Sequence, residues 1–128
     1  FGRNHLKSVV IPSSVCVISK ETFAFYRKLE SVTMPQESKL RNIGKDAFAY
    51  CENLKELDLS NCEYLQYLPE YLIASSGTKK LRINSSIQSI HPDTFKASSL
   101  DTVYVDNDKY SFTEFFKKIT YHNFKAFW

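Results

Sequence analysis

Histidine and cysteine side chains most readily supply a general base, a nucleophile or a soft metal ligand, and the chain contains three of each. Catalysis or metal binding needs such groups at related positions, so that folding brings them together. The histidines lie far apart, none is matched with a cysteine, and no C-x-x-C pair occurs. We therefore predict no enzyme activity, no cofactor and no metal site from these residues: His5, His91, His122, Cys16, Cys51 and Cys62.

Charge and hydropathy exclude two classes of partner. The 17 basic and 14 acidic residues give a net charge of only +3, and both signs are scattered along the chain. A nucleic-acid-binding protein would concentrate its basic residues, so we expect no nucleic acid partner. No apolar run reaches the roughly 18 residues of a membrane span, so we expect no membrane insertion in this segment.

The strongest signal in the sequence is an internal repeat. Five blocks follow the pattern L-x-x-L-x-L, with Thr78 as the one polar residue at an apolar position. An apolar triplet with internal spacings of three and five residues follows each of the first four blocks. The repeats are 23, 25, 24 and 22 residues long, and Phe1 lies where a preceding repeat would carry its phenylalanine, so we expect a longer array. The blocks start near Leu6, Leu29, Leu54, Thr78 and Leu100.

This repeat predicts a solenoid. Alternate residues of each L-x-L segment point to one face of a short strand, and a unit this small buries that face only by stacking on its neighbours. We expect a parallel sheet with one strand per repeat on one side, and irregular or short helical turns on the other. The triplets would form the opposite wall of the core, with an inner column made of Phe23, Phe48, Ile73 and Phe95.

The repeat pattern stops after Val105. Ser111 and Glu114 form a capping box, and the apolar residues that follow have helical spacing. We therefore divide the chain into a solenoid over residues 1–105 and a capping segment over residues 106–128, with a helix near residues 111–120. The apolar stripe of that helix consists of Phe112, Phe115, Phe116 and Ile119.

The segments Leu6 to Val15 and Ile43 to Leu54 resemble the BspA-like, or treponemal-type, leucine-rich-repeat family. Its pattern is approximately L-x-x-I-x-I-P-x-x-V-x-x-I-G-x-x-A-F-x-x-C-x-x-L, and the resemblance covers residues 1 to about 105. The cysteine of A-F-x-x-C is kept only as Cys51, and the proline is missing from the third and fourth repeats. The resemblance implies a leucine-rich-repeat solenoid, adhesion at the surface of bacteria or parasitic protists, and no catalytic residues.

The strand residues that face away from the core are the candidate site for another protein. Neighbouring strands lie about 4.8 Å apart, so an acidic pair on the third strand would lie beside a basic pair on the fourth. The alternative is that these charges only pair with one another. The candidate partner-binding residues are Glu56, Asp58, Lys80, Arg82 and Tyr104.

Two functions remain open from the sequence. The first is a cell-surface or secreted adhesion module, favoured by the resemblance and by the single glycosylation sequon at Asn84. The second is an intracellular structural or assembly protein docked within a large complex, which the unpaired cysteines favour. Residues preceding Phe1 would distinguish them, because a signal peptide or an anchor there supports the first function.

Overall fold

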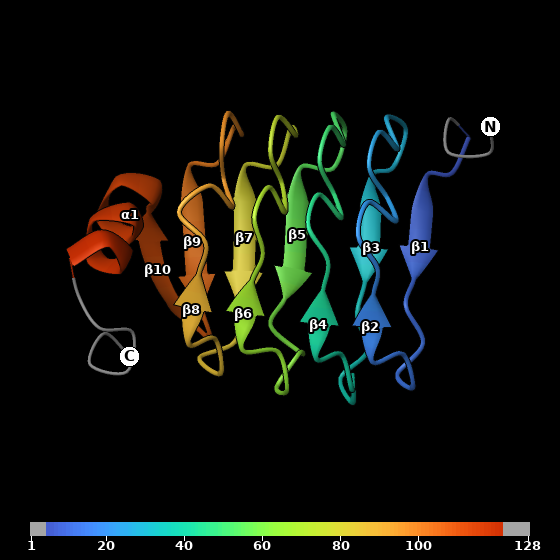
Figure 1. Ribbon diagram of the computed structural model, residues 1–128, viewed down its shortest axis with the longest axis horizontal. Helices are drawn as coiled ribbons and strands as arrows, with labels where there is room; N and C mark the ends of the chain where they lie inside the picture. The colour runs from blue at the N-terminus through green and yellow to red at the C-terminus, as the bar shows by residue number, and fades with distance from the viewer. Residues whose placement is uncertain (1–4, 122–128) are drawn as a thin grey trace.

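One short strand from each repeat forms the first wall of the molecule (Figure 1). In the computed structural model, which describes residues 5–121, these strands stack in chain order and run parallel, as the repeat predicted. Phe1 and His122 lie outside the described residues. The five strands are β1 (Ser8–Val10), β3 (Ser31–Thr33), β5 (Glu56–Leu59), β7 (Lys80–Ile83) and β9 (Thr102–Val105).

The opposite wall is more regular than expected. Each repeat contributes a two-residue strand there, and these strands also pair in parallel, β2 with β4 and β6 with β8. Two residues are too few for the alternation that identifies a strand in a sequence. The predicted solenoid with a parallel sheet is confirmed, and it has strands on both walls. The second wall consists of β2 (Val17–Ile18), β4 (Asn42–Ile43), β6 (Tyr67–Leu68) and β8 (Ser89–Ile90).

Turns close each coil after the second strand. The stretches around Phe23 and Phe48, where short helical character was one expectation, form turns that stack on one another. The backbone N–H of Phe23 donates to Ala47 O at 2.9 Å, and that of Phe48 donates to Leu72 O at 3.0 Å. Several turn residues other than glycine have positive φ, a conformation rare for such residues. They include Glu21, Phe25, Asp46, Tyr50, Tyr71, Ser75 and Ala97.

The core fills the space between the two walls. Phe48 and Ile73 are completely buried, and Phe23 and Phe95 are nearly so, as predicted for the inner column. The rings of Phe23 and Phe48 stack with centroids 5.3 Å apart and an interplanar angle of 7°. Because the column runs from one repeat to the next, each repeat is stabilised by burial against its neighbours.

A strand and a helix cover the last repeat. Strand β10 (Asp108–Ser111), which was not predicted, pairs antiparallel with β9, and helix α1 (Phe112–Tyr121) follows at once. The capping box is present: Ser111 Oγ accepts the N–H of Glu114 at 3.2 Å, and Glu114 Oε2 accepts the N–H of Ser111 at 3.2 Å. Phe115 is fully buried near Phe95, so the apolar stripe of α1 closes the end of the core.

The strand ladders are interrupted between the second and third repeats, at what we call the seam. Within the described residues, no ladder joins β3 to β5 or β4 to β6, and Figure 1 shows a wider gap at both places. On the second wall Pro69 is one cause. Its counterparts Gly44 and His91 donate their N–H to Ile18 O and Leu68 O, whereas proline has no N–H.

Other contacts hold the seam together. The stacked turns, which we call the turn row, continue across the seam through backbone hydrogen bonds such as that from Phe48 N–H to Leu72 O. Two asparagine side chains also cross it, because Asn53 Nδ2 donates to Arg27 O at 2.7 Å and Asn61 Nδ2 donates to Met34 O at 2.9 Å. Among residues 5–121, no helix is long and apolar enough to cross a membrane.

Candidate interaction surfaces

The five predicted partner-binding residues lie on the outer face of β5, β7 and β9. The register places Glu56 beside Lys80 and Asp58 beside Arg82. It places Arg82 beside Tyr104 in turn. The structure therefore brings the five side chains onto adjacent positions of one sheet, where all are exposed or partly exposed.

Arg82 is the centre of this face. Its Nε lies 3.5 Å from Glu56 Oε2, a diagonal contact, since the direct neighbour of Glu56 is Lys80. Its guanidinium carbon lies 4.0 Å from the centroid of the Tyr104 ring. An exposed ion pair contributes about 0.2–1 kcal/mol, and an exposed cation–π contact about 0.5–1 kcal/mol. These contacts hold the guanidinium in place over the sheet.

Asp58 and Lys80 do not form the second cross-strand pair. Asp58 Oδ1 accepts the N–H of Ser60 at 3.0 Å and also the Ser60 hydroxyl, so its carboxylate stabilises the turn after β5. No ion pair in the described part of the chain involves Lys80. Of the four charged residues, Glu56 and Arg82 thus form an ion pair, Asp58 stabilises a turn, and Lys80 is exposed.

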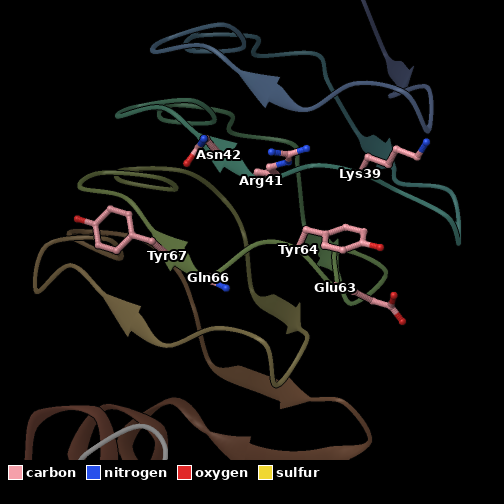
Figure 2. Close-up of a pocket in the computed structure, with 7 residues that line it drawn as sticks. All are labelled: Lys39, Arg41, Asn42, Glu63, Tyr64, Gln66 and Tyr67. Carbon is pink, nitrogen blue, oxygen red and sulfur yellow. The ribbon is translucent and has the colours of Figure 1, made fainter.

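A second surface lies over the seam on the opposite wall, and the sequence had not indicated it. Seven side chains from β4, β6 and the links that precede them line a groove with a volume of about 870 Å³. Figure 2 shows how these side chains lie. Tyr64 and Tyr67 stand exposed on the third-repeat side, with 58% and 43% of their surface accessible. The lining residues are Lys39, Arg41, Asn42, Glu63, Tyr64, Gln66 and Tyr67.

Repeat alignment could have revealed this groove. Lys39, Arg41 and Asn42 occupy the same repeat positions as Tyr64, Gln66 and Tyr67. At those positions the first and fourth repeats carry mostly small residues: Ser14, Cys16 and Val17, then Ser86, Gln88 and Ser89. Large polar and aromatic residues are therefore concentrated in the two repeats that border the seam. Counting aromatics over the whole chain hid this contrast, because the count also includes the core residues Phe23, Phe48 and Phe95.

Folding also gathers Glu70, His91 and Asp93, with their ligand atoms within 4.8 Å of one another. Neighbouring groups already contact His91 and Glu70. His91 Nδ1 accepts the N–H of Asp93 at 2.9 Å, and His91 Nε2 lies 3.8 Å from Glu70 Oε2. Lys45 Nζ lies 3.3 Å from the other oxygen of Glu70, which raises the pKa of Lys45. Within this cluster, His91 Nδ1 is thus occupied by a backbone donor and Glu70 is paired with Lys45.

The two buried cysteines serve packing. Burial raises the pKa of the Cys51 thiol from 9.0 to about 12, and the thiol donates to Phe23 O at 3.1 Å. Burial also raises the pKa of Cys62, whose sulfur lies 3.8 Å from Ser38 Oγ. A buried, protonated thiol is a poor nucleophile. These sites bridge neighbouring coils of the solenoid, as Asn84 does when its Nδ2 donates to Ser60 O at 3.0 Å.

Comparison with known families identifies the repeat. The family model described as BspA type Leucine rich repeat region matches residues 1–125 in six copies. That is two more than the four complete repeats recognised by their spacing. Among curated proteins and among solved structures, no significant match to the chain was found.

Proposed function

The chain belongs to the BspA-type leucine-rich repeat family, and from that premise we propose that it is a non-catalytic adhesion module. The module would bind another protein through the outer face of β5, β7 and β9. Core packing leaves the outward side chains of these strands free to contact a partner. This face is where the predicted residues Glu56, Asp58, Lys80, Arg82 and Tyr104 come together.

The stacking of Arg82 on Tyr104 supports this proposal most directly. Arginine and tyrosine are the residue types most enriched at binding hot spots. The contact with Glu56 further limits the rotamers of Arg82 in the free protein. A side chain that is already ordered loses less conformational entropy on binding, so the pair is preorganised for recognition.

The alternative function is an intracellular scaffold within a large complex. Cys16, Cys51 and Cys62 are all free thiols, which is the common state of cysteine in a reducing compartment. The same sheet face would serve such a scaffold. Immunolocalisation in intact source cells separates the two functions, because an adhesion module is accessible to antibody without permeabilisation and an internal scaffold is not.

A double variant tests the outer face of β5, β7 and β9, which we call the sheet face. We expect Arg82→Glu with Tyr104→Ala to weaken binding of the partner recovered from the native source by more than about 2 kcal/mol. Circular dichroism first establishes that the variant is folded. Isothermal titration calorimetry then measures its affinity for the partner. The matched control is Lys28→Glu, a charge reversal at an exposed residue outside this face, which should leave affinity unchanged. Unchanged affinity of the double variant would place the interface elsewhere.

A further inference from the structure

We propose that the groove over the seam, lined by the seven residues in Figure 2, binds an acidic, extended peptide segment of a partner protein. This site lies on the wall opposite the sheet face, so it is independent of the function proposed above. It would give the solenoid a second surface with its own ligand chemistry.

The groove exists because the ladder between β4 and β6 is missing. Pro69 lacks the N–H that its counterparts Gly44 and His91 donate to the preceding coil. Cα atoms of β4 and β6 still lie within 8 Å of each other. A strand inserted between β4 and β6 would require them to lie two strand spacings apart, each of about 4.8 Å, and the observed separation is smaller. A peptide must therefore lie over the groove and be recognised through side chains.

Charge determines the sign of the ligand. Lys39 and Arg41 border the groove on the side of the second repeat, and both are exposed. Neither forms an ion pair with any residue in the range 5–121. Glu63 is the one acidic residue of the lining, so two cations face one anion. Carboxylate side chains match these cations, and an arginine can bind a carboxylate through two parallel hydrogen bonds.

The other lining residues suit a polypeptide. Tyr64 and Tyr67 offer exposed ring faces with polar hydroxyl ends, the combination that dominates peptide-binding surfaces at low entropic cost. The amides of Asn42 and Gln66 can each donate to a peptide carbonyl and accept from a peptide N–H. Because the groove has amide, aromatic and basic groups side by side, it can contact both the backbone and the carboxylates of an extended segment.

Heteronuclear NMR titration of the chain with synthetic octapeptides tests the assignment. The probe alternates glutamate and serine, and the control peptide has glutamine in place of glutamate. We expect the glutamate peptide to shift the amide signals of Arg41, Tyr64 and Tyr67, and to bind at least about fivefold more tightly than the control. Equal binding of the two peptides would overturn the proposal.

Three variants identify the groups responsible. Lys39→Ala with Arg41→Ala should weaken binding of the glutamate peptide at least about tenfold, and Glu63→Gln should strengthen it about twofold to fourfold by removing repulsion. The matched control Lys28→Ala should leave affinity unchanged. A loss of the same size in Lys28→Ala would show that charge acts nonspecifically and would overturn the site.

The same titration distinguishes this proposal from its rivals. The sheet-face variant with Arg82→Glu and Tyr104→Ala should bind the peptide with unchanged affinity. The proposal for the groove and the proposal for the sheet face can therefore fail independently. Dextran sulfate serves as the competing anion. If the groove signals respond to dextran sulfate and not to the glutamate peptide, the ligand is a sulfated polysaccharide and the peptide assignment is wrong.

Discussion

Phe48 lies within the inner column, where it is fully buried and stacked on Phe23. We predict that Phe48→Ala lowers the free energy of unfolding by about 3–5 kcal/mol, because the surrounding coils are closed on both sides and cannot fill the cavity. Tyr50→Ala is the matched control, since the Tyr50 side chain is 43% exposed and its ring stacks on the exposed Phe25. Its cost should be about 0.5–1.5 kcal/mol. Urea denaturation measures both, and equal losses would contradict the assignment of the column.

Cys51 makes stability depend on pH above the physiological range. Its folded pKa is raised from 9.0 to about 12, so between these values the unfolded chain loses a proton that the folded chain keeps. The free energy of unfolding should therefore fall as the pH rises from 9.0 toward 12, by at most about 1.4 kcal/mol per pH unit from this group.

Comparison of the parent protein with Cys51→Ala isolates this effect from lysine and tyrosine titration. The difference in unfolding free energy between the two proteins should change with pH in that range and stay constant below it. A constant difference throughout would show that the thiol ionises equally in both states.

Within α1, adjacent phenylalanines differ in their environment. Phe115 is fully buried near Phe95 and Tyr110, whereas Phe116 is 41% exposed. We predict that Phe115→Ala costs about 3–5 kcal/mol of stability and Phe116→Ala less than about 1.5 kcal/mol. Thermal denaturation followed by circular dichroism gives the comparison. A larger loss in Phe116→Ala would mean that the helix packs on the solenoid through another face.

Elements that depend on side-chain periodicity could be predicted from the sequence. The first-wall strands, the inner column and the helix that starts after Ser111 all follow from apolar spacing and capping. Strands β2, β4, β6 and β8 have two residues each, too few for a period. Strand β10 contains Asp108, Lys109, Tyr110 and Ser111, which do not alternate as a half-buried strand does. Its position follows instead from pairing with the open edge of β9.

The candidate site was predictable only in part. Positions of Glu56, Lys80 and Arg82 follow from the repeat register, because the register fixes which residues are neighbours. The diagonal contact of Glu56 with Arg82 and the turn role of Asp58 depend on rotamers, which spacing does not specify. The groove depends on a missing backbone donor at Pro69, an effect visible only when equivalent positions of successive coils are compared.

Across the whole molecule, the seam should appear in hydrogen exchange. The ladders pair the amides of Leu57 and Leu68 with the next coil, whereas those of Val32 and Ile43, at equivalent repeat positions, face the seam. We predict that Val32 and Ile43 exchange at least about tenfold faster than Leu57 and Leu68, although all four side chains are buried. Amide exchange followed by NMR tests this. Equal protection would mean that the two halves open together.

The interrupted ladders also determine how the solenoid responds to force. A pull along its long axis loads the coils in series, and the seam is the coupling with the fewest backbone bonds. It is held by the turn row, by the core and by the side chains of Asn53 and Asn61. The coils on either side keep complete ladders and are therefore stiffer. Under tension we expect the coils on either side of the seam to keep their shape, and the molecule to lengthen first at the seam, where the groove would open.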